Sequence, residues 1–517
     1  MREVELKLEI DRGDVSRLLR DPRLRERVQG RGTTRNLHSV YFDTRELALA
    51  ARGIALRVRR DGRRRVQTLK ARGAEQGAHF DRIEYESSTT RDEPDLELVP
   101  DPELRARVAE ALAGAPLEPV IETRIRRTRR LLRCEGASVE LDVDLGEVCA
   151  AGETQPLCEI ELELREGDPG ALYDLALELL EVVPLQISAV SKADLGLAVL
   201  TGEPPAPRKA PPCALDPDAT LDEVVALTLG ACLAQVLANQ APAQLGRDLE
   251  GVHQMRVGIR RLRSALRLFR PVLPLALRRP LERELRWLGR ELGAVRDLDV
   301  FVVERLEPLR ALRPDDQGLD ALRTVAQAAR AEQQEALRRA LHSPRFTRLV
   351  LEIGRVVARR SWRSQPLDER SARLFTPARV LAAPLLERLD AKVRRAGARV
   401  EDLELARLHR LRIQVKRLRY GVDLLGSLFP GRRLERYHER LPELQDRLGR
   451  LADLATAQRL LALLIERVDA DARPACARAA GFVEGWATAD VARAMRRLAK
   501  PWARLARARP FWSDGTG

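Results

Sequence analysis

Aromatic side chains are scarce in this chain of 517 residues, of which Phe, Trp and Tyr make up 4%. Proteins that hold single-stranded nucleic acid stack its bases on such side chains, and the sequence contains no groove-reading or single-strand-reading motif. A nucleic-acid partner is therefore the least favoured explanation of the chain's charge.

Paired cysteines and a leader segment are also lacking. The six cysteines form no CxxC pair and no zinc-binding spacing. The first ten residues, MREVELKLEI, lack the apolar core of a signal peptide, and we expect no apolar run of membrane-spanning length. Scattered cysteines in a large chain are typical of a reducing compartment. The sequence therefore predicts a cytoplasmic protein with no membrane partner.

Charge is distributed unevenly along the chain. Residues 1–200 contain 32 Lys and Arg against 38 Asp and Glu, whereas the remainder contains 59 against 39. Such an asymmetry, with so basic a second segment, indicates a polyanionic partner for that segment.

A proline-rich stretch separates two segments of different pattern. Before it, short runs alternate between charged and apolar residues, as in β-strands; after it, apolar residues recur at helical spacing. We predict an α+β domain over 1–200, a linker over 201–217, an all-helical domain over 218–505 and a tail over 506–517.

The N-terminal strands carry their charges on one face. In EVELKLEI, which begins at Glu3, charged and apolar residues alternate, and the same alternation places Asp142 and Asp144 together in VELDVDLG. The charged face of one antiparallel strand usually meets water. Seven such strands with charges of both signs instead favour a closed antiparallel β-barrel that has a charged lumen. Helices predicted at 14–20, 92–112 and 169–183 would cover its apolar face.

Six motifs in order carry a resemblance to a known family. They are EVELK (3–7), VYFDT (40–44), ALRVRR (55–60), TLK (68–70), EIELEL (159–164) and SKADLG (191–196). The segment resembles the CYTH domain of the triphosphate tunnel metalloenzymes. The resemblance implies a tunnel that binds a triphosphate chain and hydrolyses it with Mg²⁺ or Mn²⁺.

The resemblance also implies roles for individual residues. Hard divalent cations prefer carboxylate oxygens, so the implied metal ligands are Glu3, Glu5, Glu159 and Glu161, with Asp144 and Glu86 as further candidates. Guanidinium and ammonium groups suit phosphate oxygens, and the implied contacts are Lys7, Arg35, Arg57, Arg59, Lys70, Arg124 and Lys192. Arg126 and Arg127 compete with Arg124 for the lumen. The implied catalytic group comprises Glu3, Glu5, Lys7 and Glu161.

A basic segment occurs twice in the helical half. HQMRVGIRRLR begins at His253 and HRLRIQVKRLR at His409, and the same offset aligns LGAVRDL (292–298) with LGRLADL (448–454). This predicts two similar antiparallel helical bundles, over about 218–345 and 375–505. Each basic helix would bury an apolar stripe and present a separate row of cations. Arginine-rich helix faces are commonly solvated and interleaved with acids, but these two segments contain no Asp or Glu.

The repeated pattern resembles the CHAD domain, an all-helical module named for its histidines. The resemblance implies binding to inorganic polyphosphate and association with polyphosphate granules in bacteria. The implied contacts are His253, Arg256, Arg260, Arg263, His409, Arg412, Lys416 and Arg419, with Arg261, Arg417 and Arg296 as second choices.

Together the two resemblances predict a metal-dependent inorganic triphosphatase whose second domain binds long-chain polyphosphate. Tripolyphosphate is favoured over thiamine triphosphate or a cyclase reaction on ATP, because the domain order matches bacterial inorganic triphosphatases. The alternatives are a polyphosphate-granule binding protein whose tunnel has little turnover, and the less favoured nucleic-acid binder.

Overall fold

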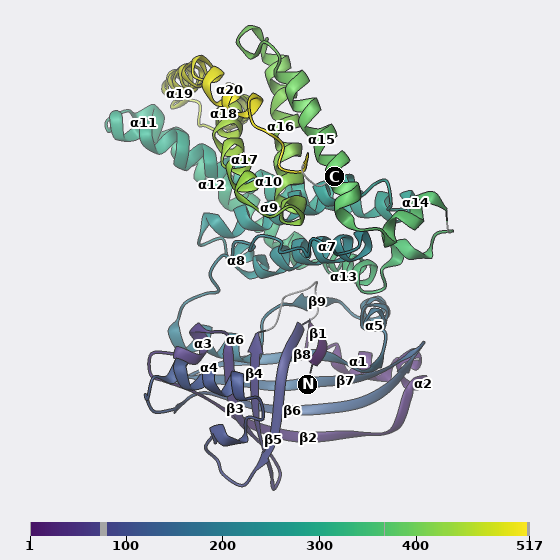
Figure 1. Ribbon diagram of the computed structural model, residues 1–517. Coiled ribbons are helices and arrows are strands. Elements are labelled where there is room, and N and C mark those ends of the chain that lie inside the picture. Colours follow the sequence, from purple (N-terminus) through teal and green to yellow (C-terminus); the bar gives the residue numbers. More distant parts are fainter. Residues whose placement is uncertain (1, 73–79, 367, 514–517) are drawn as a thin grey trace. The chain divides into compact units, whose positions relative to one another are not determined.

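The computed structural model describes residues 2–72, 80–366 and 368–513 (Figure 1). These residues form two compact units. One comprises the chain up to residue 207 together with 341–361, and the other comprises 208–340 together with the chain from 362 onward. Each unit is described separately below.

The N-terminal unit is built on one antiparallel sheet. Within the described residues it has nine strands, in the order β5-β4-β3-β2-β6-β7-β8-β1-β9, and β1 pairs additionally with β5 from Arg2↔Ile83 to Glu5↔Phe80. The strands are β1 (Arg2–Ile10), β2 (Val28–Asp43), β3 (Ile54–Asp61), β4 (Arg64–Arg72), β5 (Phe80–Thr89), β6 (Glu118–Cys134), β7 (Ala137–Ala150), β8 (Glu153–Gly167) and β9 (Leu185–Ser188). An antiparallel sheet with flanking helices is thereby confirmed, whereas the closed barrel stays a prediction.

Strand β1 shows how the sequence builds this sheet. Leu6 and Leu8 are fully buried on one face, and Glu5 and Lys7 are buried on the other, as expected for a period of two. The charged face therefore does not meet water here. It faces into the unit, where other charged residues join it.

Helices cover the sheet at several places. They are α1 (Val15–Arg20), α2 (Pro22–Glu26), α3 (Ala48–Ala51), α4 (Pro102–Leu112), α5 (Gly170–Val182), α6 (Lys192–Thr201) and α13 (Pro344–Ala358). The predicted segments 14–20 and 169–183 correspond to α1 and α5. The predicted helix over 92–112 starts only at Pro102 with Asp101 as its N-cap, because prolines within that stretch disfavour helix before them.

Helix α6 was not predicted, and it positions a charged side chain on the inner face of the sheet. Its start is fixed by a capping box in which Ser191 and Asp194 exchange hydrogen bonds. A Cβ added at Gly196 would lie 2.4 Å from Ile121 of β6, so only glycine permits this close approach of helix and strand. Lys192 is the first residue of α6 and is buried.

Helix α13 belongs to the N-terminal unit although it lies between the two basic segments in sequence. It packs on α5 and β9. Thr347 donates a hydrogen bond of 2.8 Å from Oγ1 to the carbonyl of Leu185 in β9, and Gly354 lies against the ring of buried Tyr173. Since β9 pairs with β1, α13 supports the strand that carries Glu5 and Lys7.

The second unit is all-helical, which confirms that part of the predicted fold class. Its main helices are α7 (Leu221–Ala238), α8 (Gln240–Leu245), α9 (Leu249–Leu268), α10 (Leu275–Val300), α11 (Glu307–Leu312), α12 (Gln317–Leu341), α14 (Glu369–Ala372), α15 (Ala378–Gly397), α16 (Leu405–Leu425), α17 (Arg432–His438), α18 (Arg440–Ile465), α19 (Arg473–Arg496) and α20 (Ala499–Ala506).

The duplicated sequence is visible in the packing of these helices. The two basic segments form α9 and α16. Helix α9 packs against α7 and α10, and α16 packs against the corresponding α15 and α18. An isolated antiparallel bridge joins Thr220, before α7, to Pro377, before α15. Because α9 and α16 also pack against each other, the two basic segments come together.

One segment corrects a sequence expectation. Among the described residues, Leu221–Leu245 is the single stretch whose length and composition would allow it to cross a membrane. In its most apolar window 67% of the residues are buried. A helix that is apolar on all sides suits a position inside a core, and α7 packs against both α9 and α15. The expectation of no such run was wrong, but packing accounts for its apolar character.

The packing of α13 gives a testable prediction. A Cβ at Gly354 would lie 2.1 Å from Cε1 of Tyr173, so Gly354→Ala should destabilise the N-terminal unit by about 1–3 kcal/mol through overpacking. The matched control is Gly481→Ala in α19, where a Cβ meets nothing within 4 Å and helix propensity should improve by up to about 1 kcal/mol. Scanning calorimetry would measure both; an unchanged transition in Gly354→Ala would contradict the packing of α13 on α5.

Candidate functional site

A cavity of about 160 Å³ lies on the charged face of the N-terminal sheet. Eight Lys or Arg side chains and five Glu side chains line it, so both signs of charge meet in one place. The charged lining comes from six strands and the first turn of α6: Glu5, Lys7, Arg57, Arg59, Lys70, Glu84, Glu86, Arg127, Arg129, Glu161, Glu163, Arg165 and Lys192.

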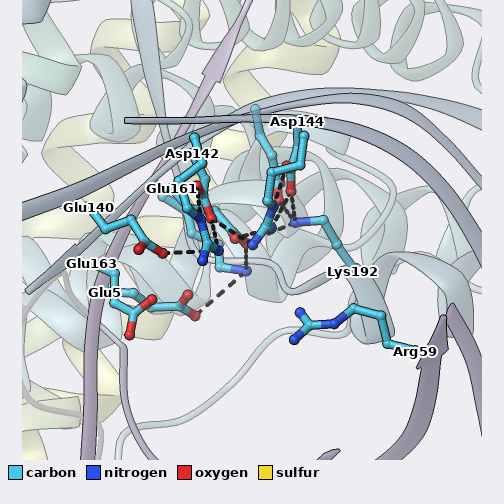
Figure 2. A network of polar contacts seen from close by, with 12 residues as sticks. Glu5, Arg59, Glu140, Asp142, Asp144, Glu161, Glu163 and Lys192 are labelled. Carbon is cyan, nitrogen blue, oxygen red and sulfur yellow. Dashed lines mark hydrogen bonds and ion pairs between the residues drawn. The ribbon is translucent and has the colours of Figure 1, made fainter. Parts of the chain in front are cut away.

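Three carboxylates converge beside this lining, and Glu161 is the one of them that lines the cavity itself. Asp144 of β7 and Glu159 and Glu161 of β8 each place an oxygen within 4.8 Å of the other two. The ammonium group of Lys192 lies among them, 2.8 Å from Asp144 and 2.8 Å from Glu161, and it also bonds Glu159 (Figure 2). We refer to Asp144, Glu159 and Glu161 as the acidic cluster.

Strand β1 contributes a second ammonium group. Lys7 donates a 2.7 Å hydrogen bond to Glu161 and lies 3.6 Å from Glu5. Burial alone would raise the pKa of Glu161, but Lys192 and Lys7 hold that pKa well below its usual range. Burial would lower the pKa of Lys7, but its carboxylate neighbours raise it. Both groups are therefore charged at neutral pH.

Arg127 completes this buried network from β6. Its guanidinium donates bonds of 2.7 Å to Asp144 and 2.6 Å to Glu161, and lies 2.7 Å from Asp142. In register, Arg127 faces Asp144 and Arg129 faces Asp142 across the β6–β7 ladder. Of Arg124, Arg126 and Arg127, the structure places Arg127 in the buried network.

The opposite wall of the cavity carries cations paired with β5. Arg59 lies 2.9 Å from Glu86, and Lys70 lies 3.1 Å from Glu84. Arg57 donates a long hydrogen bond of 3.4 Å to the hydroxyl of Tyr41. Arg57 and Arg59 are on β3 and Lys70 is on the neighbouring strand β4, so the three residues present their charges side by side.

Several predicted residues do not reach the cavity. Arg35 lies opposite Arg127 in the β2–β6 register, but its exposed guanidinium pairs with Asp61 at 2.5 Å. Arg124 is 59% exposed and pairs with Glu122. Arg126 is exposed too, because even-numbered residues of β6 point away from the network. The side chain of Glu3 lies outside the described residues.

Sequence reasoning missed Arg129 and Arg165 as lining residues. Arg129 binds Asp142 with bonds of 2.9 and 2.8 Å, and Arg165 donates a 2.6 Å bond to Glu140. The signal was present in the spacing, since Arg127 and Arg129 share a face. Choosing between the odd and even arginines required the strand register, which the sequence does not state.

A second cluster of charge lies in the helical unit, between α9 and α16. Arg256 and Arg260 come from the first repeat, and Arg412 and Lys416 from the second; burial and mutual proximity lower the pKa of Arg256, Arg412 and Lys416. Among the described residues none of the four has a carboxylate within ion-pair distance. The Nε atoms of Arg260 and Arg412 are buried without a hydrogen-bond partner. We call these four residues the cationic cluster.

The remaining predicted residues of this unit fall into separate environments. His253 is half-buried near the cluster, where burial and Arg296 lower its pKa, and His409 is exposed. Arg261 is buried and bonds Gln235 at 2.9 Å. Arg419 lies 3.8 Å from Asp423. Arg263 and Arg417 line a neighbouring pocket.

Comparison with known proteins matches these two units in order. The CYTH domain family matches residues 1–195, and the CHAD domain family matches residues 227–462. The chain belongs to the CYTH–CHAD proteins. The sheet with its buried acids and bases is thus a CYTH domain, and the helices that carry the cationic cluster form a CHAD domain.

Individual relatives resemble one domain or the other. The crystal structure of the CHAD domain from Ricinus communis is 35% identical, covering 59% of this chain and 98% of that chain, with a TM-score of 0.50. An inorganic triphosphatase of Haemophilus influenzae is 29% identical over 161 residues, or 31% of this chain; the match spans 45% of that protein's length. A Hippeastrum protein described as having a dominant triphosphatase activity is 24% identical, covering 38% of this chain and 96% of that chain, with a TM-score of 0.29.

The donors in the CYTH domain fit a hard divalent cation. The acidic cluster offers three convergent carboxylate oxygens, the ligand type that Mg²⁺ and Mn²⁺ prefer. Oε1 of Glu5 is buried and accepts no hydrogen bond, so it retains the capacity to coordinate. Glu86 is paired with Arg59 and stands apart from the cluster. Lys192 holds a positive charge where these carboxylates would bind a metal.

The role of Lys192 in the CYTH domain can be tested through stability. Lys192→Met should cost about 3–5 kcal/mol of unfolding free energy at pH 7.5, because it leaves buried carboxylates less compensated. Their pKa values in the folded variant should rise above the unfolded values of about 4, so the penalty is full above the raised pKa values and shrinks as the pH falls from them toward about 4. Denaturant unfolding at pH 7.5 and pH 4.5 measures the difference.

The control for that measurement is Arg124→Met, which removes only exposed ion pairs and should cost less than about 1 kcal/mol at either pH. Equal losses for Lys192→Met at both pH values would contradict a charge-compensating role.

Proposed function

We propose that the CYTH domain hydrolyses an inorganic triphosphate, with tripolyphosphate as the preferred substrate, in the cavity described above. The observation that carries the proposal is the lining itself: eight cations and five carboxylates share a cavity of about 160 Å³. The excess of cations suits an anion, and the carboxylates suit the divalent cation that accompanies it. The β1–β5 pairing supports a sheet closed into a tunnel around this cavity.

The residues divide naturally between the two components. Arg57, Arg59 and Lys70 form a row on adjacent strands that would bind phosphate oxygens along an extended chain. The acidic cluster, with Glu5 nearby, would hold Mg²⁺ or Mn²⁺. When bound, such a cation neutralises phosphate charge and lowers the pKa of a water molecule. Lys7, Arg127 and Lys192 hold the acidic cluster in place and would orient the terminal phosphate for in-line attack.

A non-catalytic tunnel is the second candidate. The ammonium group of Lys192 contacts all three carboxylates of the acidic cluster, so it would compete with a metal ion for them. If that competition prevails, the cavity would capture phosphate chains with little turnover.

Phosphate release distinguishes the two candidates. The intact protein with Mg²⁺ or Mn²⁺ should release phosphate from tripolyphosphate, and Glu161→Gln should reduce kcat/KM at least about 100-fold, since one charged ligand of the acidic cluster is lost. Arg59→Ala should cost about tenfold or more, whereas Arg124→Ala, outside the cavity, should stay within about twofold. Activity in Glu161→Gln equal to that of the intact protein would remove the enzyme proposal.

For the CHAD domain we propose binding to long-chain inorganic polyphosphate, and through it association with polyphosphate granules in a bacterial cytoplasm. The four cations repel one another, and Asp297 and Asp453, which lie beyond ion-pair distance, offset this repulsion only in part, so an anion among the cations would be stabilised. Linear polyphosphate supplies repeated negative charge and no bases or apolar groups. The scarcity of aromatic residues disfavours nucleic acid as the anion.

Lys416 makes this proposal sensitive to pH. Burial and the guanidinium groups of Arg412 and Arg260 lower the pKa of Lys416 to about 8. Below that pH the side chain is a cation that binds phosphate, and above it the charge is lost. Polyphosphate affinity at constant ionic strength should therefore fall severalfold between pH 7 and pH 9.5. Lys416→Arg should flatten that profile, because arginine stays protonated.

Charge-reversal substitutions test whether the cationic cluster is the polyphosphate-binding site. Arg260→Glu should weaken polyphosphate binding at least about tenfold, whereas Arg419→Glu, at a side chain already close to Asp423, should have little effect. If Lys416→Arg keeps the original pH profile, another group titrates; if Arg260→Glu binds normally, the cationic cluster is not the site.

A further inference from the structure

A separate pocket in the helical unit carries features that polyphosphate does not need. It has a volume of about 430 Å³, within the range of about 300–1,000 Å³ of small-molecule sites, and side chains of α9, α10, α15 and α16 line it. The cationic cluster lies outside this lining.

The rim of the pocket is strongly basic. Eight Lys or Arg residues and one acid, Glu282, line it. Glu282 is shared by Arg278 at 2.5 Å and Arg286 at 3.9 Å. The other six cations have no carboxylate partner among the described residues: Arg263, Arg267, Arg270, Arg388, Lys392 and Arg417. Burial together with Arg417 lowers the pKa of Arg267, and Nε of Arg417 is buried without a hydrogen-bond partner.

The floor of the same pocket is apolar. Leu385 and Leu389 of α15, together with Tyr420, Gly421 and Leu424 of α16, make up this apolar part of the lining. The helices approach closely there, because a Cβ added at Gly421 would lie 2.8 Å from Leu389. An inorganic phosphate chain has no surface that would bury such a floor favourably. A ligand with an apolar ring attached to several phosphates would use both parts.

We propose that this pocket binds a nucleoside polyphosphate, with the phosphates against the arginine rim and the base on the apolar floor beside Tyr420. Arg263 and Arg417 were also predicted to contact polyphosphate, so the two ligands would compete at that edge. Arg388 and Lys392 come from α15 and belong to neither repeat of the basic segment. Substitutions at Arg388 and Lys392 therefore distinguish nucleotide binding from polyphosphate binding.

The test uses the intact protein in EDTA, which suppresses metal-dependent hydrolysis, with ATP as the probe in isothermal titration. Arg388→Glu combined with Lys392→Glu should remove one ATP-binding event per chain or weaken it at least tenfold, while affinity for long-chain polyphosphate changes less than about threefold. Both side chains are exposed, so the fold should persist. The matched control is Arg395→Glu, exposed on the same helix but outside the pocket lining, which should bind ATP unchanged.

A comparison of tripolyphosphate with ATP distinguishes binding by phosphate charge alone from binding that also uses the apolar floor of the pocket. The affinity of this pocket for tripolyphosphate should be at least tenfold lower than its affinity for ATP, because tripolyphosphate leaves the apolar floor uncovered. Equal affinity for tripolyphosphate, or ATP binding that the double reversal does not alter, would overturn the inference. Loss of polyphosphate binding in Arg260→Glu is a separate result, so the polyphosphate proposal stands or falls independently of this one.

Discussion

The CYTH domain depends on the contact between the Lys192 ammonium group and the three carboxylates of the acidic cluster. Asp144, Glu159 and Glu161 come from two adjacent strands and are buried with Lys192 inside the unit. Like charges at such spacing cannot persist in a protein interior without compensation. Lys192 supplies that compensation from α6, whose capping box and close approach at Gly196 fix where the ammonium group lies.

The buried charges of the CHAD domain are arranged in the opposite way. In the CYTH domain almost every buried cation has a carboxylate partner, and Arg127 alone contacts Asp142, Asp144 and Glu161. In the cationic cluster no carboxylate lies within ion-pair distance among the described residues, and Asp453 offsets the lowering of the Lys416 pKa only in part. The first arrangement suits a site that must hold a metal ion and a phosphate chain together. The second suits a site where only an anion completes the charge balance.

Much of this could be predicted from the sequence, because its signals are periodic. Alternation of period two placed Glu5, Lys7 and Glu161 on the inner face of the sheet, and steps of three and four grouped Arg256 with Arg260 and Arg412 with Lys416. The features that the sequence did not predict correctly depend on tertiary packing. Arg35 and Arg127 face each other in register, yet only Arg127 enters the network, since Arg35 finds Asp61 at the surface. The packing of α13 on the CYTH sheet likewise has no local signal, because its partners, Leu185 and Tyr173, lie more than 160 positions away.

The duplicated helices show why matched positions do not guarantee matched roles. Arg261 and Arg417 align in the repeat, but Arg261 is buried against Gln235 while Arg417 opens into the pocket beside α15. The same offset aligns Arg263, which lines that pocket, with Arg419, which lies near Asp423. The repeat therefore retains its symmetry where α9 and α16 face each other, at the cationic cluster, and loses it at either side. On that flank the aligned arginines differ in role, because Arg263 and Arg417, one from each repeat, line the pocket, whereas their counterparts Arg419 and Arg261 do not. A symmetric ligand such as a uniform phosphate chain suits the shared part, whereas a ligand with two chemically different ends suits the part where the repeats diverge.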